Sequence, residues 1–135
     1  MVAAMCAWHE HHEPVAGELE RRLDRGETMV VAAPALVEAY AVLTRLPFPH
    51  RLSPSDSLAL LEANFISQAR TIALDARSYQ NLLRSAPRDN IAGGRTYDAV
   101  IIACALKAKV SALLTFNTRD FLAFSAEAME IVVPS

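Results

Sequence analysis

The fold of this chain is decided by residues 96–115, TYDAVIIACALKAKVSALLT, where a long apolar helix is followed by a short apolar strand. From Thr96 to Lys109 the apolar side chains lie on almost every side of a helix, which predicts a central, buried element. The run from Ser111 to Thr115 predicts the strand that follows it. An acid, Asp98, stands in the first turn of this helix, directly after a loop.

The same alternation of helices and strands extends toward both ends of the chain. Gly26, Pro34, the segment 53–56 (SPSD) and Asp75 mark where helices end or begin. The pattern predicts helices over 8–25, 34–46, 53–65 and 75–85, a helical turn over 119–124, and strands over 28–32, 71–74 and 130–133. Such an order predicts a single α/β domain over residues 1–135, with a mainly parallel sheet and right-handed crossovers.

Composition narrows the class of protein. The chain of 135 residues has 53% hydrophobic residues, but no apolar stretch reaches the roughly 18 residues that a membrane span needs. Cys6 and Cys104 are far apart, so neither a disulfide framework nor a cysteine zinc site is predicted. No secretion signal is recognisable, and we expect a cytoplasmic protein. The net charge of −2 argues against binding nucleic acid by bulk positive charge, although a carboxylate-based nuclease is compatible with it.

Three acids follow strands or open helices, where ligand chemistry gathers in an α/β sheet. Glu38 lies one turn into the helix after the 28–32 strand, Asp98 opens the 96–109 helix, and Asp120 follows the 111–115 strand. If their elements are neighbours, the carboxylates converge and repel one another unless a cation intervenes. The expected ion is Mg²⁺ or Mn²⁺, and the matching reaction is hydrolysis of a phosphodiester.

Each acid also has a simpler explanation. The helix dipole alone favours an acid at the position of Asp98, Asp120 suits a turn, and Glu38 suits an ion pair with Arg45. Only the three acids together favour a metal site.

Three segments together resemble the PIN domain, and more narrowly the VapC ribonucleases of bacterial toxin–antitoxin pairs. They are residues 34–40 (PALVEAY), 97–103 (YDAVIIA) and 113–121 (LLTFNTRDF). The resemblance implies a three-layer α/β/α sandwich, Mg²⁺ or Mn²⁺ at about four acids, and endonucleolytic cleavage of RNA. It also implies a homodimer and neutralisation by a cognate, VapB-like antitoxin.

The resemblance assigns roles to individual residues. Asp98 is expected to be the main metal ligand, and Glu38 a ligand or the base that orients water. The fourth acid of the family falls at Asn117 or Asp120, and both assignments remain open. Thr115 matches a hydroxyl residue often found beside that acid. Apart from the resemblance, Arg88, Arg95 and Arg119 surround the acidic segments in sequence and are candidates for contacting phosphates, although ordinary surface charge is the commoner explanation.

The chain departs from the family at its start. The family opens with an apolar strand that ends in Asp-Thr-Asn-Val or similar, whereas this chain begins Met1-Val2-Ala3-Ala4-Met5. Either the natural start lies upstream, which we favour, or the first strand and the first acid are missing. The alternatives to an active toxin are therefore a catalytically impaired PIN-like binding module and a PIN nuclease that acts in RNA processing without an antitoxin.

Overall fold

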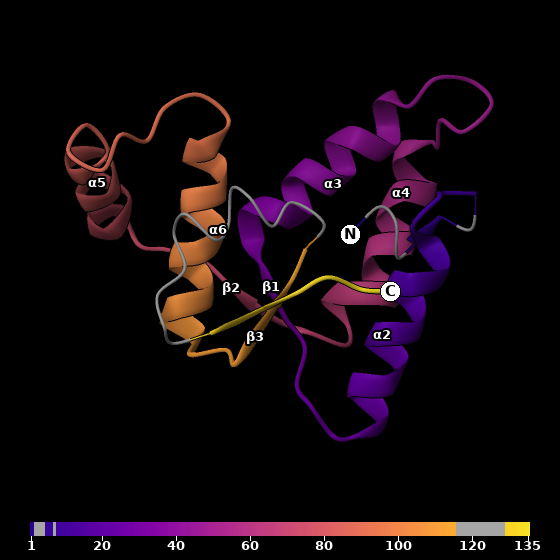
Figure 1. Cartoon of the computed structure of the whole chain (residues 1–135). Helices are drawn as coiled ribbons and strands as arrows, with labels where there is room; N and C mark the ends of the chain where they lie inside the picture. The colour runs from indigo at the N-terminus through magenta and orange to yellow at the C-terminus, as the bar shows by residue number, and fades with distance from the viewer. Residues whose placement is uncertain (2–4, 7, 116–128) are drawn as a thin grey trace. The chain divides into compact units, whose positions relative to one another are not determined.

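Helices and short strands alternate along the chain in the computed structural model, which describes residues 1, 5–6, 8–115 and 129–135 (Figure 1). In chain order the elements are α2 (His12–Asp24), β1 (Val30–Ala32), α3 (Ala33–Arg45), α4 (Pro54–Leu61), the π-helical turn η1 (Glu62–Ile66), β2 (Arg70–Ile72), α5 (Ala76–Ser85), α6 (Arg95–Ala108), β3 (Ala112–Leu114) and β4 (Glu130–Val132). This alternation confirms the predicted α/β class.

The predicted element bounds agree with the structure to within a few residues. The helix expected over 53–65 is confirmed as α4 continued by η1. The helix expected over 8–25 is observed only from His12 to Asp24. The helical turn expected over 119–124 lies outside the described residues. No helix in the part of the chain that the structure describes has the length and apolar character needed to cross a membrane.

The contacts divide the chain into two compact units, Met1–Thr71 with Ser135, and Ile72–Pro134. The described strands form two pairs, β1 with β2 and β3 with β4. In the second pair the strands are parallel, with Leu113 opposite Ile131.

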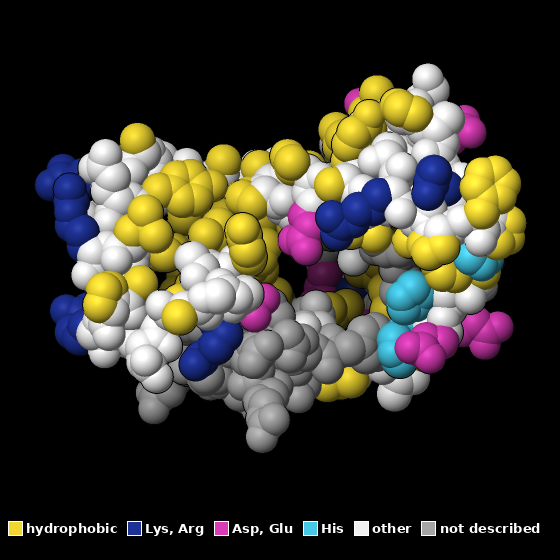
Figure 2. All heavy atoms as spheres, turned by 90° about the horizontal axis from the view of Figure 1, so that it is seen from above, with side chains coloured by type: hydrophobic (Ala, Val, Ile, Leu, Met, Phe, Trp, Pro, Cys, Tyr) yellow, Lys and Arg dark blue, Asp and Glu magenta, His cyan; other side chains and the backbone are white. Residues whose placement is uncertain are grey.

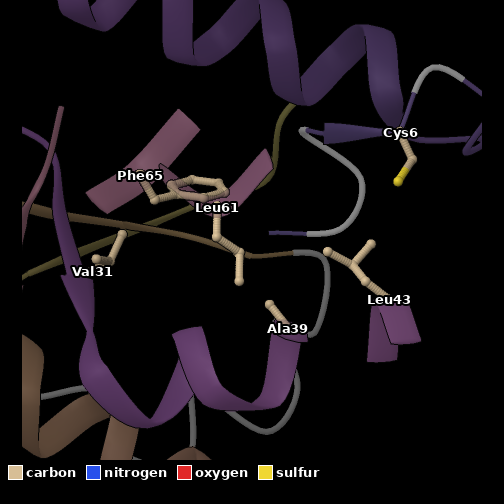
Figure 3. Packing of buried hydrophobic residues seen from close by; sticks show 6 residues of the cluster. All are labelled: Cys6, Val31, Ala39, Leu43, Leu61 and Phe65. Carbon is tan, nitrogen blue, oxygen red and sulfur yellow. The ribbon is translucent and has the colours of Figure 1, made fainter. Parts of the chain in front are cut away.

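The first unit is built around the contact of α3 with α4. Ser53 caps α4, because its Oγ accepts a hydrogen bond of 3.1 Å from the backbone N–H of Asp56. Six buried side chains converge between the elements of this unit, as Figure 3 shows, and they are Cys6, Val31, Ala39, Leu43, Leu61 and Phe65. Leu43 is 0% exposed, so the inner face of α3 is anchored where this helix nears its end.

The second unit is held together by α5, α6 and the β3–β4 pair. Asp75 caps α5 by accepting a hydrogen bond of 2.8 Å from the N–H of Ser78, and the hydrogen bonds from Ser78 lower the pKa of the Asp75 carboxyl. Lys107 on α6 donates a hydrogen bond of 2.8 Å to the carbonyl of Ala73, just before α5. Ile102 of α6 is buried in a second core cluster, against which Leu113 and Ile131 of the strands pack. Cys104 is buried and forms no disulfide, as expected for a core residue.

Candidate functional site

Glu38 is displayed on the outer face of α3. The helix begins directly after β1, with Pro34 in its first turn, where a residue without an N–H donor is tolerated. Ala39 and Leu43 face the core, whereas Val37 is 71% exposed and Glu38 is exposed beside it. Although Glu38 is flanked by apolar residues in the sequence, its charge needs no special compensation because the side chain is solvated.

The charge of the Glu38 carboxylate acts on the α-amino group of Met1. Burial lowers the pKa of the Met1 α-amino group, and the negative charge of the Glu38 carboxylate opposes that shift. The Met1 side chain packs against the core cluster of the first unit. Within the described residues Glu38 forms no ion pair with Arg45, but its exposure agrees with the simpler explanation of a solvated surface acid.

Asp98 lies in the first turn of α6, in the second unit. The N-cap residue Gly94 offers no side-chain cap, so the helix dipole is available to favour a carboxylate at this end. Asp98 is half-buried, the following Ala99 is buried, and the preceding Tyr97 is 72% exposed. The first turn of α6 therefore presents an acid and an aromatic ring side by side.

Thr115 lies toward the same end of the second unit as Asp98. From Asp98 to the end of α6 at Ala108 the helix rises by about 15 Å, and the run 111–115 returns by about 16 Å in the opposite direction. Figure 1 shows this reversal of direction between α6 and β3. The backbone N–H of Thr115 donates a hydrogen bond of 3.0 Å to the carbonyl of Val132, which holds Thr115 beside the end of β4.

The remaining predicted site residues are Asn117, Arg119 and Asp120, and they lie outside the described residues. Glu38 and Asp98 belong to different units. The predicted convergence of Glu38, Asp98 and Asp120 therefore stays a prediction, as does the choice between Asn117 and Asp120. Among the residues that the structure describes, no group of three or more His, Cys, Asp or Glu side chains is placed to hold a metal ion.

The donor chemistry of the two described acids fits a hard divalent cation. Carboxylate oxygens are the ligands that Mg²⁺ and Mn²⁺ prefer, and Mg²⁺ is commonly held by one or two carboxylates together with water and substrate phosphate. Glu38 is exposed and Asp98 is half-buried. Both are therefore chemically suited to serve as ligands.

Two exposed tyrosines stand close to these acids in the sequence and are not among the predicted site residues. Tyr97 precedes Asp98 at the start of α6, and Tyr40, which is 38% exposed, lies two residues after Glu38 on α3. Their side chains point in other directions than those of the acids, because residues one or two positions apart on a helix do not face each other.

Similarity to known proteins covers residues of both units. A family model of the PIN domain matches residues 1–126. Ribonuclease VapC40 of Mycobacterium tuberculosis, in strains H37Rv and CDC 1551, is 37% identical over 131 residues, covering 97% of this chain and 91% of the relative. Ribonuclease VapC27 of Mycobacterium tuberculosis strain H37Rv is 30% identical over 131 residues, covering 97% of this chain and 82% of the relative. The matched regions include both described candidate acids.

Proposed function

This chain belongs to the PIN domain family, and we propose that it is a divalent-metal-dependent endoribonuclease of the VapC kind. The observation that carries the proposal is the 37% identity to a ribonuclease over 97% of the chain. The exposure of Glu38 and the position of Asp98 at the start of α6 support it, because both carboxylates are presented near helix beginnings. We also propose that residues 1–135 form a single domain.

In the proposed reaction Asp98 would hold the ion, Glu38 would serve either as a second ligand or as the base that orients the attacking water, and Asp120 or Asn117 would complete the site. A bound Mg²⁺ or Mn²⁺ would supply charge neutralisation at the scissile phosphate and would make a bound water a better nucleophile. Where Glu38 is the base, its carboxylate accepts the proton of the attacking water, a phosphorus–oxygen bond to ribose breaks, and the released ribose oxygen takes up a proton from solvent water. Thr115 and Arg119 would position the substrate beside these groups.

The resemblance to VapC proteins supports a wider form of the proposal. It includes a homodimer, a cytoplasmic location and neutralisation by a cognate VapB-like antitoxin. The two alternatives, an impaired PIN-like binding module and an RNA-processing nuclease without an antitoxin, differ from it in cleavage and in partner. Sedimentation of the purified chain, with and without the product of a neighbouring small gene, tests the dimer and the antitoxin together.

Metal removal tests the proposed reaction directly. With a labelled single-stranded RNA, the purified chain is expected to cut in Mg²⁺ or Mn²⁺, to stop in excess EDTA, and to resume when Mn²⁺ is restored. Calorimetric titration with Mn²⁺ measures binding separately from cleavage. Undiminished cutting in EDTA would contradict metal dependence. A chain that neither binds Mn²⁺ nor cuts RNA would contradict the proposal and favour the binding module.

The first acid of the family leads to a further prediction. We propose that an apolar strand ending in Asp-Thr-Asn-Val, joined ahead of Met1, adds its Asp to the carboxylates that bind the ion. We expect this extension to raise the cleavage rate at limiting Mn²⁺ at least about tenfold, since a further anionic ligand favours the bound cation. The same extension with Asn in place of that Asp is the control, and an equal gain from both would contradict the prediction.

A further inference from the structure

Three exposed arginines lie on α5 and in the turn that follows it. Arg77 and Arg84 are seven residues apart on the helix, and Arg88 follows four residues later in the turn after it. The seven-residue spacing places Arg77 and Arg84 on one side of α5, because residues separated by seven positions share a helix face, and Arg88 lies beyond the end of the helix. All three are exposed, and α5 contains no acidic residue. We call Arg77, Arg84 and Arg88 the α5 stripe.

The charges of the α5 stripe are less neutralised than those of the arginines at the C-terminal end of α2. Arg21 and Arg22 form ion pairs with Glu18, with nitrogen–oxygen distances of 2.6 and 2.8 Å, and Arg25 forms one with Glu27 at 3.2 Å. By contrast, the described residues offer no ion-pair partner to Arg77 or Arg84, and Arg88 has only the exposed Asp89 at 3.4 Å. Figure 2 shows Lys and Arg side chains gathered at the side of α5, with no acidic side chain visible among them.

A groove of about 760 Å³ runs beside the α5 stripe, between α5 and α6. Arg84 and Arg88 line it from the α5 side, and its apolar walls include Leu82, Ile102 and Leu106. Polar side chains from the same helix and the following turn also line it, namely Ser78, Asn81, Ser85 and Asp89. The groove reaches Ala99, which follows Asp98 in the sequence, and the arginines, the groove and Asp98 all belong to the second unit.

We propose that the α5 stripe binds the phosphates of single-stranded RNA and that the groove beside it guides the strand toward Asp98. This inference rests on the proposed function. Guanidinium groups pair with phosphate oxygens through two parallel hydrogen bonds, and such contacts fix the register of a nucleic acid. The apolar walls and the neighbouring hydroxyl and amide groups suit unstacked nucleotides, which a duplex does not present. An acidic peptide matches the same positive charge, but the extension of the groove to Ala99, the residue after Asp98, favours the substrate.

The test compares two double substitutions that remove the same charge. Arg77→Gln with Arg84→Gln removes two members of the α5 stripe, and Arg21→Gln with Arg25→Gln removes two arginines that are 59% and 64% exposed at α2. Both are made in a chain that carries Asp98→Asn, so that a labelled single-stranded RNA is bound without being cut. The α5 variant is expected to bind about 25-fold more weakly near 0.1 M salt, from about fivefold for each phosphate contact, and its salt slope should fall by about 1.4. The α2 variant should bind as the parent does.

Equal weakening by both double variants would assign the effect to net charge and overturn the inference, as would unchanged binding by the α5 variant. If the α5 substitutions weakened binding of an Asp- and Glu-rich peptide but not of RNA, the stripe would belong to an acidic partner, and the inference would again fail. In each case RNA cutting by the unsubstituted chain would leave the proposed function standing. Absence of both RNA binding and RNA cutting would overturn the two together.

Discussion

Replacing Asp98 with Asn is expected to lower metal-dependent RNA cleavage by about 10²- to 10⁴-fold. The substitution keeps the size of the side chain but removes the negative charge that holds a divalent cation, and a metal ion contributes several kcal/mol of charge stabilisation in the transition state. Asp98 is half-buried in the first turn of α6, where an amide fits the same space. The measurement is the single-turnover cutting rate of a labelled RNA in Mn²⁺, together with Mn²⁺ binding by calorimetry.

Asp75→Asn is the matched control for this change. Asp75 also lies at a helix start of the second unit, where it caps α5, and Asn is an equally good cap. The control should keep its cutting rate, and circular dichroism should show both variants folded. Cutting by the Asp98 variant at the parent's rate would rule out the proposed mechanism.

Replacing Leu43 with Ala is expected to lower the free energy of unfolding by about 2–5 kcal/mol, as found for buried leucines elsewhere. Leu43 is 0% exposed in the core cluster of the first unit, so the smaller side chain leaves a cavity under α3. Because domains are commonly stable by only about 5–15 kcal/mol, the loss is a large fraction of the total. Urea unfolding followed by circular dichroism measures it.

The same substitution at an exposed leucine separates the cavity from the change of residue. Leu58 on α4 of the same unit is 49% exposed, and Leu58→Ala should change stability by no more than about 0.5 kcal/mol. Cleavage should fall with the Leu43 variant at temperatures where it unfolds, since Glu38 lies on the same helix. Equal effects at the two leucines would contradict the packing that Figure 3 shows.

Local chemistry made most of the secondary structure predictable. The caps at Ser53 and Asp75 were foreseen because a Ser or Asp ahead of an apolar run accepts a hydrogen bond from a backbone donor two or three residues later. Pro34 was foreseen near a helix start because its ring suits that position. These preferences act over a few residues, so they do not depend on what the rest of the chain contacts.

The exposure of the candidate site was not predictable in the same way. The sequence around Glu38 is apolar, yet α3 buries Ala39 and Leu43 while leaving Val37 and Glu38 in solvent. Which face of a helix is buried depends on the partner that covers it, here α4 and the core cluster. The groove lined by Arg84 and Arg88 was likewise not predictable, because it forms where α5 packs against α6.

The sequence by itself determined that this chain alternates helices with short strands, that acids stand near the starts of two helices, and that its motifs are those of a PIN domain. Only the tertiary structure decided which side chains face outward, that the charge of Glu38 acts on the Met1 amine, and that Arg84 and Arg88 line a groove between α5 and α6. The physical reason is the separation in sequence over which each kind of interaction acts. Capping and periodicity are set by neighbours along the chain, whereas burial and grooves arise from contacts between segments far apart in sequence.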